Sequence, residues 1–330
     1  MNGNLVEKIY QLYEFAKKSR AEIDKDWQTY YNFYIGKHHR EFTPSTKKDI
    51  ALNYCFSTIE TIVPIMTDNR PRIYVIPEER TDEEAAKLAD AIMEWSWYNL
   101  GMPVKLPLLI RSNLIWGTSF AKVYWNKVTN TVAVAVCDPH EIYIDPEAVA
   151  FEDCRYIIHA VVRDLAYIRR AYPETGQEVK ADAGYSDTKE ELEAVGDWKA
   201  DINRKALVLE CWLKEPDELE EYIEETEKGT EIKTRQKYPN GRVITVADHK
   251  LLRDISNPYS FDFPFVPFFD YQDPTRFWGV GEIQQIILLQ KEINKRKAQI
   301  MRNSDLIANP IMIVPMDSGI DTDNLTNTPG

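Results

Sequence analysis

One stretch near the end of the chain constrains the fold more than any other: residues 276–310, RFWGVGEIQQIILLQKEINKRKAQIMRNSDLIANP. It opens with two glycines and then continues without a helix breaker as far as Asn309-Pro310. At about 1.5 Å per residue, a helix of about 28 residues within 279–308 would span roughly 42 Å. That is too long for a compact domain of this size to bury throughout, so we expect a rod that carries one apolar stripe.

The residues of this stripe recur every three or four positions, which is the spacing of one helix face. The predicted seam consists of Ile283, Ile286, Ile287, Gln290, Ile293 and Ile300. Cations gather in the C-terminal half, at the end where the helix dipole favours them: Lys291, Lys295, Arg296, Lys297 and Arg302. We predict that the seam packs against copies of the chain or another long helix. The cations are expected to face either a neighbour's carboxylates or DNA.

The two glycines at the start, Gly279 and Gly281, raise the question of a phosphate-binding loop. Gln284 occupies the place of the third glycine in GxGxxG, and the GK[ST] of a P-loop is missing. We therefore interpret the pair as a helix-entry turn that changes the direction of the chain.

The composition excludes several classes of protein. With 330 residues, 44% hydrophobic and 12% aromatic, the chain has ample material for a packed core. No apolar run approaches the length of a membrane helix, and the start of the chain lacks a signal peptide. The formal charge of −13 disfavours tight general DNA binding, which depends on cations, but suits a surface that lets DNA pass. The dispersed cysteines and histidines indicate no metal, disulfide or cofactor.

The hydrophobic periodicity predicts an α+β fold, helical over 1–116 and mainly β over 117–278. Expected helices cover about 5–34, 47–64, 81–100, 104–116 and 165–172. Expected strands cover 73–76, 119–146 as a meander, 155–162, 206–214 and several segments up to 271. A capping box is predicted at Thr81–Glu84 and a hairpin turn at Asn240-Gly241. The polar segment 174–204 is expected to be a mobile surface insertion.

Two groups of carboxylates need separate interpretation. The run from Glu215 to Glu231 holds nine carboxylates and one lysine, which fits a solvated hairpin or helix face, or a docking surface for a basic partner. Asp138, Glu141 and Asp145 could serve a soluble hydrolase that acts on carbohydrate or nucleic acid. Asp-Pro also marks turns, where the aspartate bonds to its own backbone, and we favour that interpretation. No serine or cysteine nucleophile motif is present.

The order of these features resembles one family, the portal proteins of tailed bacteriophages. The matching segments are DWQTYYNFYIGKHH, ALNYCFSTIETIVPIMTDNRPRIYVIP, NLIWGTSFAKVYWN, VCDPHEIYIDPEAVAFEDCRYI and FPFVPFFDYQDPTRFWGVGEIQQIILLQKEINKRKAQI. Each is weak alone, but together they cover most of the chain. The sequence is similar to the branch with Trp-Gly and Asp-Pro signatures.

The resemblance implies a structural protein without enzymatic activity or cofactor. Portals form a homo-oligomeric ring, usually a dodecamer, at one vertex of the capsid of the virion, after assembly in the host cytoplasm. Double-stranded DNA passes through the channel without sequence specificity during packaging and ejection. Family partners are the terminase large subunit, the head–tail adaptor, and capsid and scaffold proteins.

The resemblance also implies a domain organisation. Residues 1–278 would form a wing-like α+β domain, 279–308 the first long stem helix, and 309–330 the start of a small β clip. Ile311, Ile313 and Val314 would begin that clip. Family members continue with a second stem helix and a crown, so we expect this chain to be a C-terminally truncated portal, or one part of a split one.

Overall fold

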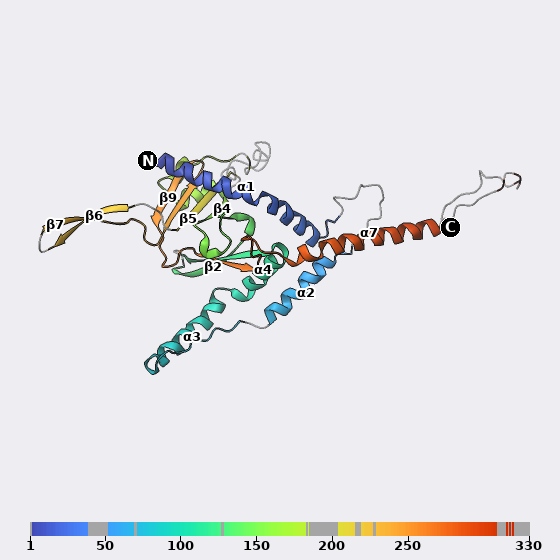
Figure 1. Ribbon diagram of the computed structural model, residues 1–330, viewed down its shortest axis with the longest axis horizontal. Helices are drawn as coiled ribbons and strands as arrows, with labels where there is room; N and C mark the ends of the chain where they lie inside the picture. Colours follow the sequence, from blue (N-terminus) through green and yellow to red (C-terminus); the bar gives the residue numbers. More distant parts are fainter. Residues whose placement is uncertain are drawn as a thin grey trace.

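The computed structural model describes residues 2–38, 52–68, 71–126, 129–182, 184, 204–214, 219–226, 229–308, 315, 317 and 319. Four helices precede a series of antiparallel strands and one long helix follows them, which confirms the predicted α+β class (Figure 1). The α-helices are α1 (Asn2–Tyr34), α2 (Tyr54–Asp68), α3 (Glu83–Asn99), α4 (Met102–Trp116), α5 (Leu165–Ala171) and α7 (Glu282–Ala308). The strands are β1 (Thr118–Asn126), β2 (Thr131–Cys137), β3 (Ile142–Ile144), β4 (Tyr156–Asp164), β5 (Lys205–Leu213), β6 (Leu219–Thr226), β7 (Gly229–Gln236), β8 (Arg242–Ala247), β9 (Lys250–Ser256) and β10 (Phe265–Phe269).

A five-stranded sheet of order β3-β4-β5-β8-β9 forms the largest layer, and α1 covers one of its faces. Successive side chains in a strand point to opposite faces, so alternate residues of each strand meet the helix. Apolar contacts join α1 to this face: Val6, Ile9, Tyr13 and Ala16 pack on Ile158, Leu209, Cys211, Ile244 and Val246. The N-terminal half of α1 is amphipathic: its apolar face packs on the sheet, and its opposite face is exposed to solvent.

The opposite face of the same sheet is covered at its two ends by different elements. At one end, Ile157, Trp212 and Val243 join a core with the three-stranded sheet β10-β1-β2. At the other end, α5 contributes Leu165 and Ile168 to a smaller core. Between these two ends, a cleft lies over the middle of this face.

The second half of α1 packs with α2, α4 and α7 into a helical layer beside the smaller sheet. Three elements project from this body. The C-terminal half of α7 extends outward, and α3 projects in another direction (Figure 1). The β6–β7 ribbon projects from the far side (Figure 1).

Two sequence predictions around the start of α3 are wrong. Residues 73–76 form no strand: Ile73, Tyr74 and Ile76 are exposed, and within the described part of the chain no other strand pairs with this segment, as a strand requires. The capping box also fails, because the chain enters α3 through a 3-10 turn at Arg80–Asp82. Asp82 is the N-cap residue and makes no side-chain cap bond, while the Thr81 hydroxyl bonds to the Asp82 carboxylate at 3.3 Å.

The hairpin predicted at Asn240-Gly241 is also wrong. The strands on its two sides have different partners, since β7 pairs with β6 and β8 pairs with β5. Gly241 does need to be glycine: its φ is +88°, and a Cβ there would lie 2.5 Å from the Leu213 carbonyl oxygen. The nearest two-residue hairpin turn is Asp248-His249 between β8 and β9, with φ values of 47° and 54°.

Other predicted segments have mixed outcomes. α2 continues past Pro64 to Asp68, because Ile59 and Val63 anchor it in the core. In the predicted insertion 174–204, residues 174–182 lie beside α5, and Val179 is buried in its core. Residues 183 and 185–203 lie outside the described residues, as do the predicted clip residues Ile311, Ile313 and Val314.

Candidate assembly surface

The root of α7 is a close backbone contact between glycines. A Cβ added to Gly279 would lie 2.4 Å from the carbonyl oxygen of Gly117, and one added to Gly281 would lie 2.7 Å from that of Leu114. The amide of Gly279 also donates to the Thr118 hydroxyl at 2.9 Å. The helix begins at Glu282 rather than at Gly279, and the predicted entry turn is the place where α7 docks against the end of α4.

A buried polar network holds the next two turns of α7. Gln290, 2% exposed, accepts a hydrogen bond from the Tyr54 amide at 3.0 Å and donates to the Leu52 carbonyl at 2.7 Å. It also donates to Asn294 at 2.9 Å, and Asn294 lies 2.9 Å from Nδ1 of His38. Gln290 therefore acts as a clamp on the start of α2. Asn294 is buried on the same face. The spacing of apolar residues does not predict its burial, because its side chain is polar.

The predicted seam is divided by this arrangement. Ile283 and Ile287 are buried in the chain's own core, and Ile286 packs against it. Ile293 is half-buried, whereas Ile300 is 63% exposed. The seam of the first half is thus an intrachain contact, and only the C-terminal half leaves apolar surface outside.

The predicted cations follow the same division. Lys291 lies 5.6 Å above the ring of Phe33, and Arg296 pairs with Glu292 at 2.7 Å within the helix. Lys295, Lys297 and Arg302 are exposed. Whether these cations face DNA or a neighbouring subunit stays a prediction.

A second apolar surface lies on α3. Leu88, Ile92 and Trp95 are spaced as one helix face, and each is more than half exposed. Ala86 is the sole buried residue of this helix. Further exposed apolar side chains belong to the neighbouring α2, α4 and segment 71–77: Ile65, Met66, Ile73, Tyr74, Ile76 and Val104. Single exposed apolar residues are normal, but patches on this scale mark sites of protein contact.

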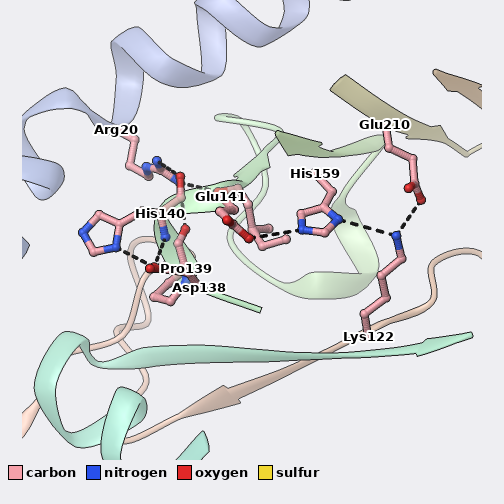
Figure 2. A network of polar contacts seen from close by, with 9 residues as sticks. Arg20, Lys122, Asp138, Pro139, His140, Glu141, His159 and Glu210 are labelled. Atoms are coloured by element: carbon pink, nitrogen blue, oxygen red, sulfur yellow. Dashed lines mark hydrogen bonds and ion pairs between the residues drawn. The ribbon is translucent and has the colours of Figure 1, made fainter. Parts of the chain in front are cut away.

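The turn that contains two of the candidate catalytic carboxylates, Asp138 and Glu141, has a structural role (Figure 2). The guanidinium of Arg20, 3% exposed, donates to the carbonyls of Pro139, His140 and Ile142. It also lies 4.0 Å above the ring of Tyr143. Arg20 thereby pins α1 to the connection between the two sheets.

Asp138, Glu141 and Asp145 each engage a different basic residue. Asp138 caps the turn through the His140 amide and ring, Glu141 lies 3.5 Å from His159, and Asp145 pairs with Arg155 at 2.6 Å. Burial raises the pKa of Asp138, but hydrogen bonds from His140 outweigh it and hold the pKa below its usual range. Burial likewise raises the pKa of Asp145, and the Arg155 guanidinium outweighs it. Carboxylates that each engage a separate basic residue do not form the convergent acid and base of a hydrolase.

The described residues contain neither a candidate metal site nor a candidate membrane helix. Among the residues that the structure describes, no group of three or more histidine, cysteine or carboxylate side chains could hold a metal ion. Within those same residues, none of the helices has the length and apolar character needed to cross a bilayer.

Comparison with known proteins adds one match. A family model described as phage P22-like portal protein matches residues 8–321 of the chain. No curated protein matches it. The match extends over the helical layer, both main sheets and the whole of α7.

Proposed function

The chain belongs to the phage P22-like portal protein family, and we propose that it is the structural subunit of a ring at the capsid vertex. In this proposal the described body is the wing and α7 is the first stem helix. The role is structural rather than catalytic, and double-stranded DNA passes through the ring during packaging and ejection. The ring would also dock the terminase large subunit and the head–tail adaptor, and contact capsid and scaffold proteins.

The observation that carries this proposal is the unpartnered apolar surface of the two projecting helices. On α3, the exposed fractions of Leu88 and Trp95 are 63% and 62%; on α7, those of Ile300 and Ile307 are 63% and 78%. A helix with an apolar face becomes stable when that face is covered, and here no element of the described chain covers it. Copies of the chain arranged head to tail would cover one face with another and close a ring.

The net charge of the chain favours a channel through which DNA passes, rather than a protein that binds DNA tightly. With 40 lysines and arginines against 53 aspartates and glutamates, the chain has no surplus of cations to hold a phosphate backbone tightly. The cations in the outer half of α7 then serve either the passing DNA or a neighbour's carboxylates. Assembly that weakens steeply with added salt would favour the neighbour, because salt screens exposed charge pairs.

Negative-stain electron microscopy of the purified protein, expressed to its natural stop codon, tests the proposal directly. We expect rings with a central hole. A homogeneous monomer at micromolar concentration, from a frame that includes everything downstream of α7, would overturn the ring. The number of subunits would follow from class averages viewed along the axis.

A further inference from the structure

The uncovered middle of the five-stranded sheet forms a cleft of about 790 Å³ between the two sheets and α5. Its floor is the sheet face that carries His159 and Val161 from β4, Glu210 from β5 and Arg253 from β9. Its walls are Lys122 and Trp125 on one side and Tyr167 and Tyr172 on the other. None of the residues that line this cleft belongs to the helical layer or to α7, so the proposed assembly surfaces give it no role.

The charges in the cleft do not cancel. Lys122 donates to Glu210 at 2.7 Å, and Glu210 also accepts from the indole N–H of Trp212 at 2.6 Å (Figure 2 shows the first pair). Burial raises the pKa of Glu210, but the Lys122 ammonium outweighs it, so the carboxylate stays ionised and the pair is neutral. The two remaining charges that line the cleft are Arg163 and Arg253.

Both arginines are placed to meet an anion. The guanidinium of Arg163 lies 5.3 Å above the ring of Tyr167 at the exposed rim. Arg253 is half-buried and forms no ion pair with any residue in the described part of the chain. A half-buried guanidinium without a carboxylate leaves part of its hydrogen-bonding capacity unused, so the cleft suits an acidic ligand with apolar or aromatic character.

The β6–β7 ribbon has the complementary properties. Its first strand alone contains Glu220, Glu221, Glu224 and Glu225, together with Tyr222 and Ile223. The register pairs Glu224 with Glu231, where like charges destabilise the ribbon, and Glu220 with Arg235, where opposite charges stabilise it. Glutamates outnumber the basic residues of the two strands, Lys233 and Arg235. A two-stranded ribbon on its own is marginally stable in water, so a cationic surface that receives it would stabilise it.

In the sequence, the ribbon is an insertion between two strands of the five-stranded sheet. These strands, β5 and β8, are neighbours in space and pair directly, with Leu213 opposite Arg242. The ribbon therefore leaves the sheet after β5 and the chain returns to the same edge at β8. Among the described elements, the ribbon packs closely against no helix or other strand. It extends away from the body (Figure 1), a direction that favours a cleft on another molecule over its own.

We propose that the β6–β7 ribbon of one subunit binds in the inter-sheet cleft of a second copy, with its glutamates at Arg163 and Arg253. This contact deepens the proposed function, because it would tie each subunit of the ring to the next through the wing. The aromatic rims of the cleft would cover the apolar residues of the ribbon.

The test uses two partners between which the ribbon–cleft contact can form in one direction only. The acceptor is the chain with residues 215–240 replaced by a Gly-Ser turn, which keeps the cleft and removes the ribbon; the pairing of β5 with β8 permits this junction. The donor is the full chain with Arg163→Gln and Arg253→Gln, which keeps the ribbon and weakens its own cleft. Binding of donor to fluorescently labelled acceptor is measured by anisotropy, and thermal melts confirm that both variants fold.

Charge exchange then identifies the contact. Glu220→Lys with Glu224→Lys in the donor ribbon should weaken binding at least tenfold. The same change of charge at the exposed Glu7 and Glu14 on α1 is the matched control and should leave binding unchanged. An acceptor with Arg163→Glu and Arg253→Glu should no longer bind the unaltered acidic ribbon of the donor. It should bind the donor ribbon that carries Glu220→Lys and Glu224→Lys. Equal affinity for both ribbons, or no binding at 100-fold excess of donor, would overturn the proposal.

Electron microscopy separates this inference from the proposed ring. Should the ribbon-less chain form rings as readily as the unaltered chain, the ribbon contact fails and the ring stands. Should donor and acceptor bind as expected while the unaltered chain forms no ring, the ribbon contact stands and the ring fails.

Discussion

The two halves of α7 carry the same spacing of apolar residues but lie in different surroundings. In the first half, Ile283 and Ile287 are buried, and Gln290 satisfies backbone groups of the segment that leads into α2. In the second half, Ile300 and Ile307 face outward and are more than half exposed. A periodic pattern therefore defines a face of a helix without defining what covers it. For the first half the cover is the chain itself, and for the second half we propose another subunit.

This difference makes the two halves respond differently to the same change. Substitutions at the root of α7 should lower the free energy of unfolding of a single chain. Substitutions in the outer half should leave that free energy unchanged and alter association.

The largest effect is expected for Gly279→Ala. The new methyl group would lie 2.4 Å from the Gly117 carbonyl oxygen and 2.9 Å from that of Tyr271, and both are backbone atoms with little freedom to move. We expect a loss of more than about 4 kcal/mol, at the exceptional end for a single substitution. Expression in the soluble fraction and urea-induced unfolding measure it.

Gly101→Ala is the matched control for this substitution. Gly101 has a left-handed φ of +67°, yet an added Cβ would find only the Lys105 side chain, at 3.9 Å. We expect a loss of about 1–2 kcal/mol from backbone strain alone. Equal losses at the two glycines would contradict the close contact at the root of α7.

The second prediction concerns the polar clamp. Gln290→Leu keeps the volume but removes the partners of the Tyr54 amide and the Leu52 carbonyl. Each buried group left without a partner costs about 1–3 kcal/mol, so we expect a loss of about 2–4 kcal/mol. Gln299→Leu, on the exposed half of the same helix, should change the free energy of unfolding by less than about 0.5 kcal/mol. A small effect at Gln290 would mean that water reaches this network.

The sequence predicted the helices and most strands because their periodicity comes from local chain geometry. It predicted α4 up to Trp116 and the position of α7, where periodicity and glycine coincide. It failed where structure depends on a distant partner. The segment 73–76 has the residues of a strand but no neighbouring strand, and Asn240-Gly241 has the residues of a hairpin turn but joins strands of different sheets.

The candidate surface was predictable in part for the same reason. The apolar seam was visible in the sequence, but its division between core and surface depends on α1, α2 and α4, which lie more than 160 residues away in the chain. The cleft left no signal, since Lys122, Glu210 and Arg253 come from three strands that only the sheet topology brings together. Asn294 is missed because burial of a polar residue cannot be read from hydrophobic spacing.

The third prediction uses pH at the start of α7. Burial, and then the nearby Glu282 carboxylate, raise the pKa of Asp270 to about 6. Because the folded state binds this proton more tightly than the unfolded state, Asp270 lowers stability as the pH rises from about 4 to 6. Asp270→Asn should therefore stabilise the chain at pH 7 to 8. We expect a gain of about 1 kcal/mol, reduced from the full shift because the carboxylate is partly exposed.

The difference between variant and unaltered chain, measured from pH 4 to 8 in urea, isolates this group. Glu60 contributes in another window: its pKa is lowered to about 2 by hydrogen bonds from Arg111 and Tyr34, so its stabilisation is lost only below about pH 4.5. Asp273→Asn is the control, because the pKa of Asp273 lies below its usual range. A gain that does not depend on pH would show that ionisation of Asp270 is not its cause.

The smallest effect on the single chain is expected for Ile300→Gln, and its comparison with Ile287→Gln tests the division of α7 directly. Ile287 is 9% exposed and Ile300 is 63% exposed, so the same substitution meets the core in one case and solvent in the other. We expect a loss of about 2–4 kcal/mol for Ile287→Gln and less than about 0.5 kcal/mol for Ile300→Gln. Both are measured by urea unfolding at submicromolar concentration, where association does not add to stability.

Association should reverse this order. If the outer half of α7 is covered by a neighbour, Ile300→Gln and Ile92→Gln on α3 should each weaken assembly about tenfold or more, measured by sedimentation across a concentration series. Each should still unfold like the unaltered chain when dilute. An Ile300→Gln variant that loses as much stability as Ile287→Gln would show that the outer half of α7 folds back on its own chain. Such a fold would remove the apolar surface on which the ring proposal depends.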